Sequence, residues 1–192
     1  MKALVPLLVA AALLSAPSAP AKAATAKKKA AASGPLSLAV STQKKILVVR
    51  LGGADVKTYD VAVGTKSKPT PMGRFSISHI VWNPPWHPPD EKWAKGKKPA
   101  GPNDPKNPMK VVKLFFQEPD YYIHGTDKEE SLGGAASHGC IRMAQADVYE
   151  LARYVQEHAG AAHDEAWYNR VVGSDQSADV RLPHGVPIAI GK

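Results

Sequence analysis

The sequence predicts a mainly β single domain with one or two helices near its functional end. Several short segments alternate apolar and polar residues, one longer segment has helical spacing, and glycines and prolines separate them. The chain has 192 residues, enough for one domain plus a leader. Its composition, 44% hydrophobic and 22% charged, is typical of a soluble globular protein.

Residues 1–23 predict a secretory signal peptide. Lys2 supplies a positive start, Ala3–Ala16 is an apolar run, and Ala21–Ala23 offers a small-x-small cleavage site. The alternative is a retained anchor, but the run has only 14 residues against the ~20 that span a bilayer. We therefore expect an exported protein of the periplasm or cell envelope, with no stable membrane span after cleavage.

Residues 24–35 are rich in alanine and lysine and predict a linker, which leaves residues 36–192 as the folded domain. The net charge is +8, and removal of the signal peptide leaves +6. The basic linker is either a solvated tether or a means of attraction to an anionic wall or membrane surface. We expect no nucleic-acid partner, because no helix-turn-helix, zinc-finger or RNA-binding motif is present.

The elements follow in chain order. Alternation of apolar residues predicts early strands, and Gly52–Asp55 predicts the turn between the second and third of them. The second half of the chain is predicted to contain two more strands, a long helix and a second short helix. Val180–Ile190 predicts one or two edge strands, because its two prolines lack ladder donors. Apart from this last segment, the predicted strands are Leu36–Val40, Lys44–Leu51, Val56–Val63, Phe75–Val81, Met109–Phe116 and Tyr121–Gly125. The predicted helices lie within Ala144–Gly160 and His163–Gly173.

Residues 82–108 have a different composition, with eight prolines and three of the four tryptophans. So many prolines exclude a regular element. The tryptophans favour a loop that packs down as a lid or groove wall, and the alternative is a flexible insertion.

Cys140 is the only cysteine, which is unusual in an exported chain because thiols outside the cytoplasm are normally paired. It forms an intermolecular bridge, is an inert buried residue, or is a reactive thiol. His124 lies 16 residues upstream at the end of a predicted strand, and a Gly-rich loop between them can return the chain. A His–Cys contact would give an activated nucleophile, and a following helix N-terminus could lower the thiol pKa.

The neighbours of Cys140 leave several roles open. His138 could be a base, an oxyanion donor through its backbone, or a binder of substrate, and the amides from His138 to Cys140 could form an oxyanion site. Arg142 could clamp a substrate carboxylate or form an internal salt bridge. A zinc site made of His124, His138 and Cys140 is the main rival, although no common metal-binding spacing is present.

The segment IHGTDKEESLGGAASHGCIRM, Ile123–Met143, resembles the active-site signature of the bacterial L,D-transpeptidase catalytic domain. The segment Tyr59–Ile77, with its VG turn and TPMGRF, resembles the other recurring segment of that family. The resemblance covers about residues 36–190. Where many relatives have Asn-Pro-Leu-Gly, this chain has Asn107-Pro108-Met109-Lys110, which affects the expected shape of the groove.

This resemblance implies a β-sandwich-like domain that carries out acyl transfer with a cysteine nucleophile and no cofactor. The partners implied are peptidoglycan stem peptides, with a lipoprotein as another acceptor in some members, and a monomer is the default. The alternatives are an L,D-carboxypeptidase-type thiol hydrolase and a non-catalytic peptidoglycan-binding module.

The resemblance also implies a role for each matched residue. It makes Cys140 the nucleophile and His124 the base and later acid, with the Gly125 carbonyl orienting the His124 ring. It places His138, Gly139 and Cys140 around the oxyanion, and Ser137 and Arg142 in the shape and charge of the pocket.

Overall fold

The computed structural model describes residues 33–192. The predicted signal peptide and most of the predicted linker lie outside this part of the chain. Within it, no helix combines the length and the apolar character that a membrane span needs.

The described chain is mainly β with two α-helices, as the sequence predicted. Eight strands form one sheet in the order β3-β2-β1-β10-β5-β6-β7-β9, and β4 pairs with β8 in a separate two-stranded sheet. The strands are β1 Leu36–Ser41, β2 Ile46–Leu51, β3 Ala54–Asp60, β4 Val63–Gly64, β5 Gly73–Trp82, β6 Val112–Gln117, β7 Tyr121–Gly125, β8 Ala135–Ser137, β9 Ile141–Met143 and β10 Ala178–Gly191.

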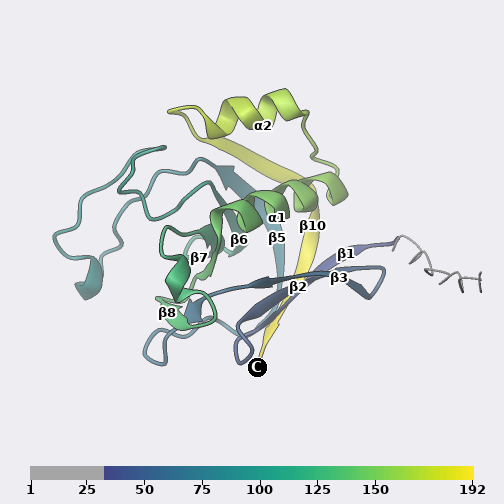
Figure 1. Cartoon of the computed structure of the whole chain (residues 1–192), viewed down its shortest axis with the longest axis horizontal. Helices are drawn as coiled ribbons and strands as arrows, with labels where there is room; N and C mark the ends of the chain where they lie inside the picture. Colours follow the sequence, from purple (N-terminus) through teal and green to yellow (C-terminus); the bar gives the residue numbers. More distant parts are fainter. Residues whose placement is uncertain (1–32) are drawn as a thin grey trace, which may run out of the picture. The chain divides into compact units, whose positions relative to one another are not determined.

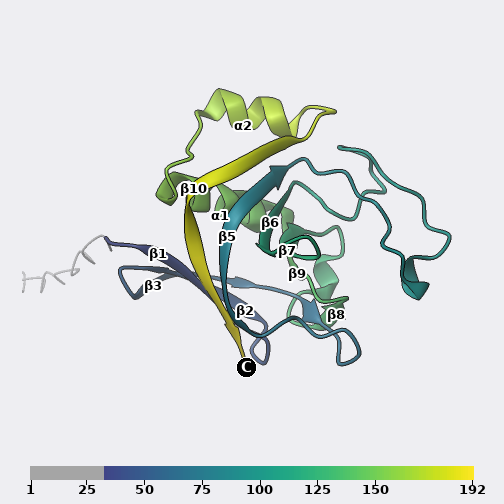
Figure 2. The same cartoon turned by 180° about the vertical axis from the view of Figure 1, so that it is seen from behind.

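The helix α1, Gln145–His158, covers one face of this sheet (Figures 1 and 2). Its apolar positions recur with helical spacing and pack against β6 and β7, and Gly160 follows at φ +76°, a conformation that ends helices. The second helix, α2, Glu165–Val172, starts at Asp164, whose side chain accepts a hydrogen bond from the Trp167 amide at 2.8 Å. Both helices therefore confirm the sequence prediction. The buried residues of α1 are Val148, Leu151, Ala152, Val155 and Gln156.

Two predictions about the strands were wrong. β10 is an inner strand, between β1 and β5, rather than an edge strand. Its prolines are tolerated because Pro183 lies where the register with β5 shifts, and Pro187 precedes the first residue paired with β1, Ile188. The third predicted strand ends at Asp60, and Val63 belongs to β4 instead.

The Trp/Pro-rich loop, residues 83–108, is ordered by hydrogen bonds within itself, which the flexible-insertion alternative did not anticipate. Trp86 and Ala100 pair across it through backbone hydrogen bonds of 2.8 and 2.9 Å. The buried Asn107 side chain donates to the carbonyls of Pro84 and Gly101 at 2.8 and 2.9 Å. A short 3-10 helix, η1, Lys92–Ala94, lies within the loop.

Candidate active site

The strand registers place the candidate site on one face of β6, β7 and β9. His124 on β7 lies opposite Lys113 on β6 and opposite Arg142 on β9. Residues paired across a sheet project to the same side, and Cys140, two residues before Arg142, continues the alternation onto that side. The topology thus gathers His124, Cys140 and Arg142 on one face, with Lys113 and Tyr122 beside them.

His124 is buried and its ring is fixed by the adjacent backbone. Its Nδ1 lies 2.7 Å from the Gly125 carbonyl oxygen, which can only accept, so Nδ1 carries the proton and Nε2 is left as a free base. Burial lowers the pKa of His124 to about 3, and the Arg142 and Lys113 charges also lower it. The imidazole is therefore neutral near pH 7, as a general base must be.

The Cys140 thiol is half-buried, and its Sγ donates to the Asp120 carbonyl at 3.4 Å. Burial raises the pKa of this thiol, while hydrogen bonds from Tyr122 and the charges of Lys113 and Arg142 oppose the rise. The pKa of this thiol is thus raised, whereas the sequence suggested that the following helix N-terminus could lower it. The thiol at rest bonds to Asp120, and in the described chain no hydrogen bond joins it to His124.

The loop from Ser137 to Cys140 is held by its own hydrogen bonds. The Ser137 hydroxyl donates to the Cys140 carbonyl and accepts from the Gly139 amide at 3.1 Å. Gly139 has φ +116°, and a Cβ there would lie 2.7 Å from the Tyr121 ring. Since the Gly139 amide is occupied, the amides of His138 and Cys140 are the remaining oxyanion candidates in this loop.

His138 is exposed and lies against the Trp/Pro-rich loop. Its ring stacks on Trp93, with centroids 4.0 Å apart and planes at 15°. Burial, followed by the Arg142 charge, lowers the pKa of His138. The Trp93 Nε1 is buried, and no partner for it lies within the described residues. The loop thus reaches the residue two positions before Cys140, a contact that the sequence did not reveal.

Two half-buried cations flank His124. Within residues 33–192, neither Arg142 nor Lys113 forms an ion pair, so the internal salt bridge considered for Arg142 is not what the structure shows. Sequence reasoning missed Lys113. The only available signal was a lysine in the middle of an otherwise apolar strand.

The departure at Lys110 leaves the site backbone intact. The Lys110 carbonyl accepts from the Gly125 amide at 3.1 Å, and a Cβ on Gly125 would lie 2.3 Å from that oxygen. The contact uses only the backbone of Lys110, so it does not need a glycine at 110. The contact does need a glycine at position 125, because a side chain there would clash with the Lys110 carbonyl oxygen.

A family model described as the L,D-transpeptidase catalytic domain, YkuD, matches residues 36–178. The chain belongs to this family. The YkuD protein of Bacillus subtilis (strain 168), named as a candidate L,D-transpeptidase, is 35% identical over 121 residues, which cover 63% of this chain and 61% of that protein. The YqjB protein of the same strain, named in the same way, is 32% identical over 58% of this chain and 61% of its own length.

The fold is also similar to that of solved structures. One described as the Ldtfm–avibactam carbamoyl enzyme has a TM-score of 0.53 and 15% identity, covering 81% of this chain and 48% of that one. At this identity the likeness establishes the fold alone. This chain thus spans about three fifths of the curated relatives that it matches and about half of that solved chain.

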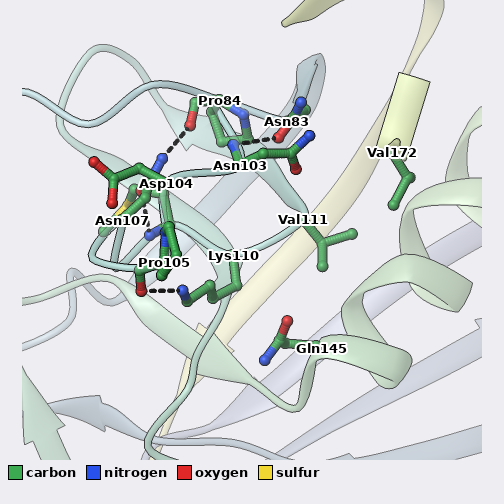
Figure 3. A pocket seen from close by; sticks show the side chains of 11 residues that line it. Asn83, Pro84, Asn103, Asp104, Pro105, Asn107, Lys110, Val111, Gln145 and Val172 are labelled. Atoms are coloured by element: carbon green, nitrogen blue, oxygen red, sulfur yellow. Dashed lines mark hydrogen bonds between the residues drawn. The ribbon is translucent and has the colours of Figure 1, made fainter. Parts of the chain in front are cut away.

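A cavity of about 250 Å³ is lined by residues of the Trp/Pro-rich loop, by Lys110 and Val111, and by Gln145 and Val172 (Figure 3). Its asparagines already serve the loop: Asn83 Oδ1 accepts from the Asn103 amide at 3.1 Å, and both side-chain amides donate to the Ser174 carbonyl. The cavity therefore supports the loop rather than the site. In the part of the chain that the structure describes, no group of three or more metal-ligating side chains gathers, so the zinc alternative has no ligand cluster.

Proposed function

We propose that this protein is a peptidoglycan L,D-transpeptidase with Cys140 as nucleophile and His124 as general base and acid. The observation that carries the proposal is the pairing of β7 with β9. It places a neutral, backbone-oriented imidazole on the same sheet face as the one thiol of the chain. Membership of the YkuD family supports the reaction class.

In the first step, Cys140 turns from the Asp120 carbonyl toward His124 and loses its proton to Nε2. The thiolate adds to the carbonyl between the third residue of a tetrapeptide stem and its terminal D-alanine. The amides of His138 and Cys140 stabilise the oxyanion. The C–N bond then breaks, the imidazolium of His124 protonates the departing amine, and D-alanine leaves a thioester on Cys140.

In the second step, an amine attacks the thioester. His124 removes a proton from the amine, the C–S bond breaks, and the thiol is regenerated by that proton. An amine of another stem gives a 3–3 crosslink, a lipoprotein lysine gives protein attachment, and water gives hydrolysis. Arg142 is assigned to the acyl side, where its free guanidinium can bind a carboxylate of the stem.

The test is to incubate the full chain with disaccharide-tetrapeptide and to identify the products by mass spectrometry. A crosslinked dimer with loss of D-alanine supports transfer, and tripeptide alone supports the carboxypeptidase alternative. No product, together with undiminished binding of the stem by Cys140→Ala, would favour the non-catalytic binding module. A covalent carbapenem adduct on Cys140 is a second readout.

The proposal includes an extracytoplasmic location, because the substrate is a wall peptide. The predicted signal peptide, residues 1–23, supports it. Fractionation of cells that express the full chain tests it: recovery of an uncleaved protein in the cytoplasm would contradict this part of the proposal.

A further inference from the structure

Lys113 is a half-buried ammonium with too few partners. Its Nζ lies 3.4 Å from the Pro85 carbonyl and 4.7 Å from the centroid of the Tyr122 ring. An ammonium has three donors, and no carboxylate of residues 33–192 pairs with this one. A half-buried charge without an anionic partner lowers stability, so its presence here calls for an anion that the resting chain does not supply.

The position of Lys113 indicates which anion this is. Lys113 and Arg142 lie on opposite sides of His124, across β6–β7 and β7–β9 respectively. Cys140 precedes β9, so the acylated part of a substrate lies on the Arg142 side. The leaving group lies at His124, because His124 must hand it a proton.

The leaving residue carries its own carboxylate one carbon beyond the amine that His124 protonates. Lys113 is directly opposite His124 in an antiparallel pair, where Cα atoms are about 5 Å apart. A lysine side chain can reach a carboxylate at that distance. The Pro85 carbonyl, from the Trp/Pro-rich loop, holds the ammonium on this side of the site.

Resting on the proposed function, we propose that Lys113 binds the free C-terminal carboxylate of the residue that leaves, and so restricts cleavage to the last peptide bond of the stem. The substrate class is then a peptide with exactly one residue, bearing a free carboxylate, after the attacked carbonyl. A stem extended by a further residue, or capped as an amide, presents no carboxylate at this place.

The experiment compares two matched substrates on the full chain: the tetrapeptide stem as the C-terminal acid and as the C-terminal D-alaninamide. Release of D-alanine or D-alaninamide is followed by mass. Wild type is expected to favour the acid in kcat/KM by about tenfold to a hundredfold, the range of a hydrogen bond to a charged group. Lys113→Met, which keeps the apolar stem, should reduce this preference to near unity, and Lys113→Arg should restore part of it.

Lys106→Met is the control, because Lys106 is an exposed lysine of the neighbouring Trp/Pro-rich loop and has no assigned role in the site. It should keep the wild-type preference. Equal rates for acid and amide in wild type would overturn the inference even if Lys113→Met failed to fold, and would leave the proposed function standing. Failure of wild type to cleave either substrate would instead overturn the proposed function.

Discussion

The face of β6, β7 and β9 toward α1 carries the packed core, with Leu114, Ile123 and Ile141 each 0% exposed. The opposite face of the same strands carries Lys113, His124 and, just before β9, Cys140. The two faces share one backbone and one register, and residues one position apart serve different purposes. Packing on the first face fixes the positions of groups on the second, which is how a rigid site can hold unpaired charges.

Cys140→Ser tests only the face of β6, β7 and β9 that carries Lys113, His124 and Cys140, which we call the chemical face. The serine hydroxyl ionises far less readily than the thiol, so release of D-alanine should fall by at least about a thousandfold. The melting temperature should stay within a few degrees of wild type, because the side chain changes by one atom. Retained activity would show that the nucleophile is assigned wrongly.

Ile141→Ala tests the packed face one residue away. Removal of a fully buried isoleucine side chain should lower the free energy of unfolding by about 3 kcal/mol, measured by denaturant titration. Cys140→Ala should change it by less than about 1 kcal/mol. Equal losses for the two variants would contradict the division between the faces.

The buried His124 predicts a pH dependence of stability. Its pKa in the folded chain is about 3, against an ordinary value of about 6.5, so the unfolded chain binds more protons between these values. Stability should therefore fall as the pH drops below 6.5, by about 2 kcal/mol between pH 6.5 and pH 5 from this group.

His124→Gln removes that group and is the comparison for the pH experiment. Denaturant titrations of both proteins at several pH values should show a shallower decline for the variant. A decline of the same steepness in both would mean that His124 is not held neutral.

Trp93→Ala tests the support that the Trp/Pro-rich loop gives to the chemical face. Loss of the stacking on His138 should cost about 1 kcal/mol or less of stability and raise amide exchange over Ser137–Cys140. Lys97→Ala is a matched control, since it removes only the cation 4.9 Å from the Trp93 ring. Unchanged exchange in Trp93→Ala would show that the loop does not support the site.

The sequence predicted those elements whose pattern is local. β7 begins and ends where its alternation and closing glycine indicated, and α1 and α2 carry their own spacing and end signals. β8 and β9 were not predicted, because strands of three residues take their form from the partners β4 and β7. The inner position of β10 likewise depends on which strands flank it.

The candidate site, like the fold, could be predicted from the sequence only where the signal is local. Cys140 and His124 stand out through their residue types and a signature motif, but the stacking of Trp93 on His138 joins segments about 45 residues apart in the sequence. Lys113 becomes a site residue only through the register of β6 with β7. A shift of that register by one residue would turn its side chain into the core.

The outer edge of β9 is already occupied. Ala62 and Arg142 exchange two backbone hydrogen bonds, each of 2.9 Å, on the side of β9 away from β7. A stem peptide therefore cannot dock there by β-augmentation, with its own main chain as the next strand. Recognition on this side falls to side chains and to the substrate's charges, so specificity can change by single substitutions that leave the sheet untouched.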